Sequence, residues 1–288
     1  MNDIFNKQNE PKNINLLKLA SHEYTRIQWL AIFYFVASVI VPIVLTLVNQ
    51  NIITENVRTW FNFIGAALTI FTLFFNKVLT TRKEYASSIQ DAFDRSIYGM
   101  KQSNLDVRAD PNDLQVKSSS INFKPEKMEL LSNWYSDYSK HELNRAIFYC
   151  QKANIEWDKK LRKFYVGIIV TLIIIAVSTL ISLAILFSIS VIEMLSYIWL
   201  LMPIATYAII FLLLHKRNLE SMKRLETKIQ AVEHKGEFSV RELESIQLSL
   251  YFHRKELIKV PNFFFMMFRE KQQKEADILA KIKCDEID

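Results

Sequence analysis

Glycine is scarce in this chain of 288 residues, and its four glycines stand far apart: Gly65, Gly99, Gly167 and Gly236. Because no two lie close together, the sequence contains neither a P-loop nor a dinucleotide-binding fingerprint. Cysteine is scarcer still, and the two cysteines are too far apart for a metal-ligand motif. We therefore predict free thiols in a reducing compartment.

The five histidines are scattered and form no H-E-x-x-H or other paired ligand motif. Two acidic residues, Asp91 and Asp94, share a predicted helix, but no histidine or metal-ligand spacing accompanies them. A catalytic site would have to be assembled wholly by tertiary structure. We predict no catalytic residues, no metal and no cofactor.

Charge is absent from two long apolar runs. Residues 164–192 contain no charged side chain, whereas about 20 apolar residues of helix already cross a bilayer. A second run, 194–214, follows directly after Glu193, so the two predict a helical hairpin across a membrane. Residues 27–48 and 59–79 predict an earlier pair of spans. No charged residue lies in the middle of any span, which argues against an ion-coupled transporter.

The predicted fold class is an all-α membrane protein with four transmembrane helices in two hairpins and a helical cytosolic region. Its parts are a cytosolic N-terminal segment (1–26), a first hairpin (27–79), a central cytosolic helical region (80–163), a second hairpin (164–214) and a cytosolic C-terminal helical tail (215–288).

The net charge of +6 is concentrated in three of these parts. Lysine and arginine are frequent before the first span, between the second and third spans, and after the fourth, but absent from the loop 49–57. Because positive residues keep loops in the cytoplasm, we predict a multi-pass protein with both termini cytosolic. The partner implied by this placement is the lipid bilayer, and not a DNA or RNA polymer.

The second span has one polar helical face, because small and polar residues recur there at intervals of three and four. Its members are Asn62, Gly65, Ala66, Thr69, Thr72 and Asn76. Polar groups rarely face lipid. The face is therefore either a close helix–helix seam of small, hydrogen-bonding residues or the lining of a water-filled path.

In the central region, apolar residues every four positions across 82–98 predict an amphipathic helix that continues out of the second span. Residues 128–138 are predicted to be helical, and 141–165 to form one long helix leading into the third span. In the tail, Gly236 should end one helix, and Ser239 with Glu242 forms a capping box for the next. The aromatic segment 263–268 suits either the membrane interface or packing against the cytosolic helices.

Several short stretches resemble the SMODS-associated four-transmembrane effectors of CBASS-type antiphage systems. They are Gln8-Asn9, Leu16-Leu17, Ala20 and Tyr24 before the first span; residues 89–94, similar to a Gln-x-x-Phe-Asp element; Trp134-Tyr135-Ser136; and residues 150–162, similar to a Gln-Arg-x-Asn-x-x-Trp-Asp-x-x-Leu-Arg signature. The likeness extends to about Lys216. Lys152 stands where the family pattern has arginine, and Ser21-His22 where it has Gln-Arg, which weakens any role that needs a bidentate guanidinium.

The resemblance implies a role in antiphage defence. In such systems a nucleotidyltransferase makes a cyclic oligonucleotide, and the membrane effector oligomerises and breaches the bacterial inner membrane. A cyclic oligonucleotide requires cations for its phosphates and rings for its bases. The candidate ligand-binding residues are Trp134, Tyr135, Gln151, Lys152, Asn154, Trp157 and Arg162. The alternative is that this signature fixes helix packing, with Asp158 and Arg162 paired one turn apart.

Three functions remain open at this point. The first is a pore-forming, homo-oligomeric effector whose path is lined by Asn62, Gly65, Thr69, Thr72 and Asn76. The second is a membrane-anchored scaffold or signalling adaptor without a pore. The third is a small transporter.

Overall fold

The structure is a computed structural model of the whole chain, and it describes residues 2–45, 55–101, 117–118, 121–122, 128–186, 198–256, 260 and 262–285. Within these ranges every regular element is helical. The elements are α1 (Ile4–Lys7), α2 (Pro11–Phe35), the π-helical turn η1 (Val36–Ile40), α4 (Glu55–Tyr98), α7 (Leu143–Leu186), α9 (Ile198–Lys235), α10 (Val240–Glu256) and α11 (Asn262–Asp285).

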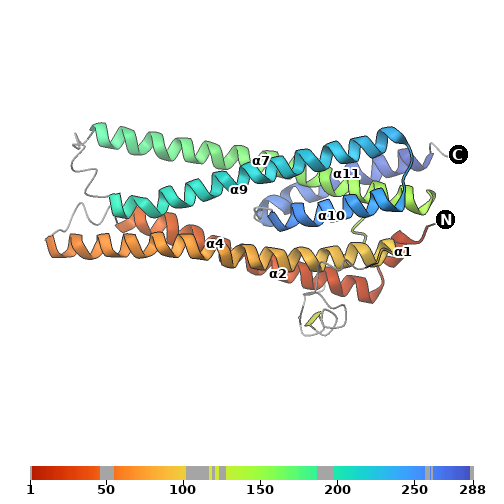
Figure 1. Ribbon diagram of the computed structural model, residues 1–288, viewed down its shortest axis with the longest axis horizontal. Helices are drawn as coiled ribbons and strands as arrows, with labels where there is room; N and C mark the ends of the chain where they lie inside the picture. Colours follow the sequence, from red (N-terminus) through yellow and green to blue (C-terminus); the bar gives the residue numbers. More distant parts are fainter. Residues whose placement is uncertain are drawn as a thin grey trace.

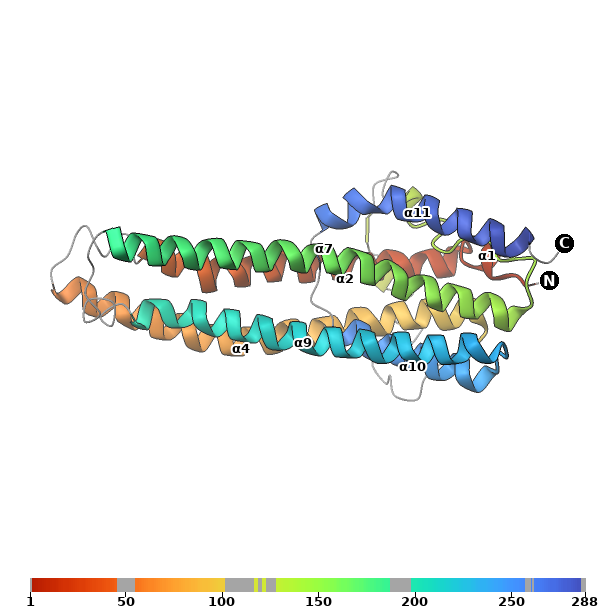
Figure 2. The ribbon, with the colours of Figure 1, turned by 90° about the horizontal axis from the view of Figure 1, so that it is seen from above.

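Four long helices, α2 with η1, α4, α7 and α9, run along the length of the molecule (Figure 1). α4 packs against α2 on one side and α9 on the other. The shorter α10 contacts α4, α7 and α9, and α11 contacts α7. These two helices lie at the end where both chain termini are found (Figures 1 and 2). We call this end of the bundle the terminal half, and the opposite end the apolar half.

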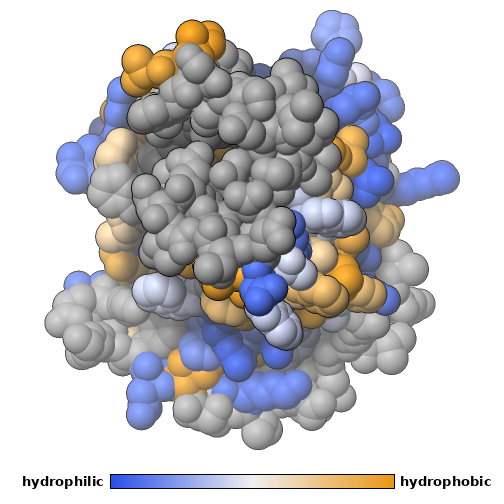
Figure 3. Space-filling model, turned by 90° about the vertical axis from the view of Figure 1, so that its left-hand side faces the viewer, coloured by the Kyte–Doolittle hydropathy of each residue, from blue (hydrophilic) through white to orange (hydrophobic). Residues whose placement is uncertain are grey.

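The apolar half exposes large hydrophobic side chains. Trp29, Trp60 and Phe74 expose 68%, 68% and 70% of their surface. Two helical stretches, Pro11–Leu45 and Thr59–Tyr98, are long and apolar enough to cross a membrane, and only 22% and 17% of their most apolar windows are buried. Figure 3 views this end, where hydrophobic side chains lie on the outer surface of the described part. A soluble protein would bury such surface.

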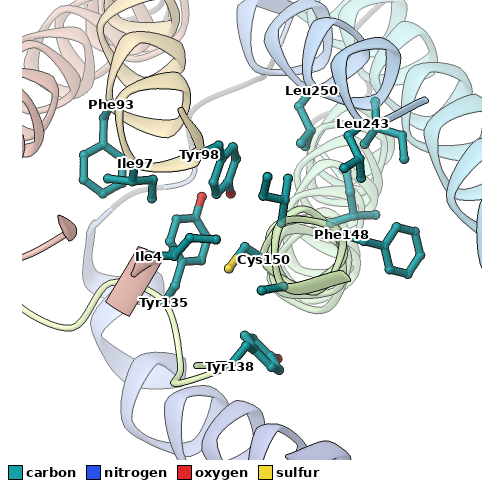
Figure 4. Close-up of a cluster of buried hydrophobic side chains, with 14 of the residues drawn as sticks. Ile4, Phe93, Ile97, Tyr98, Tyr135, Tyr138, Phe148, Cys150, Leu243 and Leu250 are labelled. Carbon is teal, nitrogen blue, oxygen red and sulfur yellow. The ribbon is translucent and has the colours of Figure 1, made fainter. Parts of the chain in front are cut away.

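The terminal half contains the main hydrophobic core. Ile89, Phe93 and Ile97 of α4 are fully buried, so the four-residue period of 82–98 correctly predicted both the helix and its inner face. Figure 4 shows Tyr135 between α4 and α7, beside Tyr98 and Cys150. α4 is therefore one continuous helix with an exposed apolar section and a buried amphipathic section.

The tail is helical as predicted. α9 ends at Lys235, next to Gly236, whose φ of +70° favours glycine. The amide N–H of Glu242 donates to the Ser239 hydroxyl at 3.3 Å, and that hydroxyl donates to the Glu242 carboxylate at 3.0 Å. This side-chain pairing at the start of α10 is the predicted capping box.

The prediction of a helix across 128–138 was wrong. Only Met128 and Glu129 are helical; a turn and irregular backbone follow, and Asn133 takes a positive φ of 50°. The side chain of Gln8 accepts from the amide N–H of Tyr135 at 2.7 Å and donates to its carbonyl at 3.0 Å. Asn9 accepts from the amide of Asn133 at 3.0 Å. Because side chains distant in sequence satisfy this backbone, the segment does not need helical hydrogen bonds.

Candidate ligand-binding cavity

The terminal half contains a cavity of about 510 Å³. Its walls come from α2, α4, α7, α10, α11 and the segment 130–136. Pockets for small ligands commonly measure roughly 300–1,000 Å³, so this cavity is large enough for one small ligand. Cationic and aromatic side chains are frequent among the residues that line it: Tyr24, Lys83, Trp134, Tyr135, Trp157, Arg162, His253, Arg254 and Arg269.

On the α7 wall, Arg162 donates two hydrogen bonds to the carboxylate of Asp158, at 2.9 and 2.8 Å. Nε2 of His253 lies 3.0 Å from the same carboxylate. Burial alone would raise the pKa of Asp158, but the charge of Arg162 and the hydrogen bonds from His253 and Arg162 lower it well below its ordinary value. Asp158 is therefore a fixed anion that neutralises Arg162.

Asp94 of α4 is buried and accepts hydrogen bonds from three side chains, of which Arg254 and Tyr135 line the cavity. Arg254 donates to it at 2.6 Å, Gln247 at 3.1 Å and the Tyr135 hydroxyl at 2.7 Å. The Asn154 side chain donates to the same hydroxyl at 2.7 Å. One hydrogen-bonded network therefore connects α4, α7, α10 and the segment that contains Tyr135, which fixes the shape of the cavity.

One guanidinium nitrogen of Arg254 has no hydrogen-bond partner among the described residues. Its guanidinium is 6% exposed and pairs with Asp94 through Nη1, whereas the buried Nη2 has no hydrogen-bond partner among the described residues. Burial alone would lower the pKa of Arg254, but the charge of Asp94 raises it above its ordinary value. The guanidinium is therefore always charged, and a buried N–H that lacks a hydrogen-bond partner is costly for the fold.

Lys83 of α4 lies on the same cavity, four residues after the end of the predicted second span. It is 8% exposed, and no ion pair to its ammonium occurs among the described residues. Burial, together with the charge of Arg162, lowers the pKa of Lys83 to about 8. An unpaired buried lysine beside an arginine destabilises the fold, so stability does not explain why Lys83 lies there.

Five of the seven predicted ligand-binding residues line this cavity: Trp134, Tyr135, Asn154, Trp157 and Arg162. The other two lie elsewhere. Gln151 is buried one turn earlier on α7 and donates to the carbonyl of Leu243 at 3.0 Å. Lys152 is on the outer surface, where its ammonium lies 2.6 Å from the Glu233 carboxylate. Both therefore contact protein and not the cavity.

Sequence reasoning missed Lys83, His253 and Arg254. A signal for Arg254 existed, because Leu243, Gln247, Leu250 and Arg254 follow helical spacing along the buried face of α10. Polar residues at core positions of an amphipathic helix indicate a buried partner or a ligand. Nothing in the sequence shows that this face meets α4 and α7.

Ser221, His253 and Asp158 are arranged like the nucleophile, the base and the orienting acid of a catalytic triad. Nδ1 of His253 lies 3.2 Å from the Ser221 hydroxyl, and Nε2 lies 3.0 Å from Asp158. Hydrolases use this order of groups. Here, however, Ser221 does not line the cavity, and Asp158 is shared with Arg162. We interpret the contact as a structural hydrogen bond between α9, α10 and α7.

One residue of the polar face of the second span, Thr72, packs against the neighbouring helices. Thr72 is fully buried, and its hydroxyl lies 2.8 Å from that of Ser38 in η1. The Tyr34 hydroxyl donates to the Thr72 carbonyl at 3.0 Å. Gly65 is buried too, and Asn62, Thr69 and Asn76 are half-buried. Thr72 thus contributes to a seam with α2 and η1, and the role of the other positions stays a prediction.

The aromatic segment of α11 is only partly described. Phe268 packs against Phe164 with ring centroids 4.8 Å apart, and Met266 lines the cavity. Met266 and Met267 nevertheless expose about half of their surface. The side chains of residues 263–265 lie outside the described residues. The described part of the segment therefore contacts both α7 and the cavity.

These features define an all-helical protein with helices that can span a membrane and a ligand-sized cavity, lined in part by cationic and aromatic side chains, at one end of the bundle. Residues 2–281 match the SMODS-associating 4TM effector domain, and the chain belongs to this family. It is 26% identical over 167 residues to a probable CBASS effector molecule from Bacillus cereus strain VD146. The match covers 56% of this chain and 55% of that relative, so the chain spans about half of its length. No solved structure matches.

Proposed function

We propose that this protein is a four-span effector that permeabilises the bacterial inner membrane when a cyclic oligonucleotide signals phage infection. The observation that carries the proposal is the continuity of α4. This single helix of 44 residues contains the exposed apolar section at one end and Lys83, Asp91 and Asp94 at the other. A change at the cavity therefore acts directly on a helix that crosses the bilayer.

The arrangement of the helices supports two hairpins. α2 and α4 have apolar sections at the same end of the bundle, and α7 and α9 run beside them toward that end (Figure 2). The third and fourth predicted spans, 164–192 and 194–214, lie partly outside the described residues. Both chain termini lie at the opposite end (Figure 1), which suits a topology in which both are cytosolic.

The first test is efflux of dye and ions from liposomes that contain the purified full-length chain, against a panel of cyclic di- and trinucleotides. We expect one nucleotide to trigger efflux. Replacing both Asn62 and Thr69 by leucine should reduce that efflux at least tenfold, because leucine closes a polar path while leaving the helix intact. The matched control, Phe63→Leu, alters a residue of the same helix that is 69% exposed and should change nothing.

Efflux that stays unchanged in the Asn62→Leu, Thr69→Leu variant would show that this face is a seam and not a pore lining. No efflux from correctly inserted protein with any nucleotide would favour the membrane-anchored scaffold. The scaffold alternative has one observation in its favour, the burial of Thr72 in the seam with Ser38. A saturable flux that needs no nucleotide would indicate a transporter.

Pore formation by four spans requires several copies of the chain, because four helices of this size enclose little space between them. We expect a homo-oligomer in the presence of the activating nucleotide. Native mass measurement in detergent, with and without the nucleotide, checks this. A monomer under both conditions would contradict it.

A further inference from the structure

We propose that the cavity of the terminal half is the binding site for the activating ligand, a phosphodiester-linked nucleotide, with Lys83 and the Nη2 group of Arg254 on its phosphate oxygens. The inference rests on the proposed function for the identity of the ligand as a cyclic oligonucleotide. The anion site itself follows from the cavity alone.

The cavity carries a positive charge that no carboxylate neutralises among the described residues. Asp158 accepts two hydrogen bonds from Arg162, and Asp94 accepts one from Arg254, so these arginines are already neutralised. Lys83 has no such carboxylate partner among the described residues that surround it. The cavity therefore has an excess of positive charge, and Lys83, which provides it, is only 8% exposed. An anion that enters it gains more than it would at an exposed surface.

Arg254, which lines the cavity, also has an unsatisfied hydrogen-bond donor. Nη2 of Arg254 is buried and lacks a partner, although its sister group donates to Asp94. Buried guanidinium groups in folded proteins are normally satisfied. A phosphate oxygen at this wall accepts from Nη2 without disturbing the pair with Asp94. Arginine and lysine together are a common combination for phosphodiester recognition.

Aromatic rings lie beside these cations. Trp134 and Trp157, both half-buried, line the cavity together with the Tyr24 side chain. An inorganic anion needs no such rings, whereas nucleobases bind more tightly when they stack on aromatic side chains. Asn154 adds an amide on the same wall. Cations with aromatic rings at this size indicate a small nucleotide and not a free phosphate.

The position of Lys83 explains how binding reaches the membrane. It belongs to α4, four residues after residue 79, where the predicted second span ends. Arg254 belongs to α10, and α4 is in contact with α10. A nucleotide in this cavity that contacts Lys83 through one phosphate and Arg254 through another therefore connects the spanning helix to the tail, and it changes how α4 packs in the state with bound ligand.

The test is equilibrium binding of the same cyclic di- and trinucleotide panel, with inorganic phosphate as a separate probe, to the full-length chain in detergent. We expect one cyclic nucleotide to bind far more tightly than phosphate. Lys83→Gln should weaken it about 10- to 100-fold, since a charge-assisted hydrogen bond contributes roughly 1.5–3 kcal/mol. Arg254→Lys, which keeps the pairing with Asp94 but loses Nη2, should weaken it similarly.

The matched control is Lys152→Gln, which removes a lysine of α7 that lies outside the cavity and pairs with Glu233. It should leave the dissociation constant within about twofold. Failure of every nucleotide to bind, or binding that Lys83→Gln and Arg254→Lys leave unchanged, would overturn the proposal. Binding with the expected losses but without efflux would uphold this site and contradict the proposed pore instead.

Discussion

Replacing Asp94 by alanine should lower the free energy of unfolding by roughly 3–5 kcal/mol, the largest effect expected of a single substitution in the terminal half. Asp94 is fully buried and accepts from Arg254, Gln247 and the Tyr135 hydroxyl. Its loss leaves the buried Arg254 charge uncompensated and two further donors unsatisfied. Thermal or denaturant unfolding of the detergent-solubilised chain measures the change.

The control for this prediction is Glu270→Ala. Glu270 also pairs with a cation, Lys274, but both are exposed on α11, so unfolding should be unaffected. Asp94→Asn separates charge from hydrogen bonding, because the amide oxygen still accepts while Arg254 loses its counter-charge. If Asp94→Ala and Glu270→Ala shift the unfolding midpoint equally, the buried network does not stabilise the fold.

Replacing Lys83 by methionine should have two opposite effects. We expect the unliganded chain to become more stable by up to about 3.5 kcal/mol, because burial and the charge of Arg162 lower the pKa of Lys83 from 10.5 to about 8 and each pKa unit corresponds to about 1.4 kcal/mol. The response to the activating nucleotide should be lost, because methionine cannot contact a phosphate. Stability is measured by unfolding, and the response by liposome efflux.

The lowered pKa of Lys83 also makes the free energy of unfolding depend on pH. Between the folded pKa of about 8 and the ordinary value of 10.5, the unfolded chain holds the proton and the folded chain does not. Stability of the natural chain should therefore rise with pH across that window, with the full cost of Lys83 present below pH 8. The other titratable or charged groups on this cavity include Tyr24, Arg162, His253 and Arg254.

Lys83→Met should remove this rise. A variant that is less stable than the natural chain, or that shows the same rise in stability with pH, would mean that the ammonium is better solvated or paired than its burial indicates. An unchanged efflux response in a well-folded Lys83→Met protein would exclude Lys83 from ligand binding.

Features that depend on neighbouring residues were predictable from the sequence. The period of four in α4 shows its buried face, because side chains one turn apart lie on the same side of a helix. The end of α9 at Lys235 follows from Gly236, and the start of α10 from Ser239 and Glu242. The apolar runs likewise indicate helices that can cross a bilayer, since hydropathy depends on local composition alone.

The conformation of residues 128–138 and the set of residues that line the cavity depend on tertiary structure alone. Residues 128–138 resemble a helix locally, but Gln8 and Asn9 provide the hydrogen bonds of that backbone from the far end of the chain. Gln151 shares a face of α7 with Asn154, yet the cavity ends between them because Leu243 of α10 is in contact with Gln151. The extent of the cavity along α7 therefore depends on how the helices pack against one another.

The sequence by itself thus determined that the chain is helical, which of its helices have apolar faces, and the family resemblance that the comparison confirmed. Only the tertiary structure placed Lys83 of α4 and Arg254 of α10 on one cavity, although 170 residues separate them in the chain. The physical reason is that the buried face of a helix follows from the spacing of apolar residues in its own sequence, whereas the pairing of buried charges depends on which helices pack together.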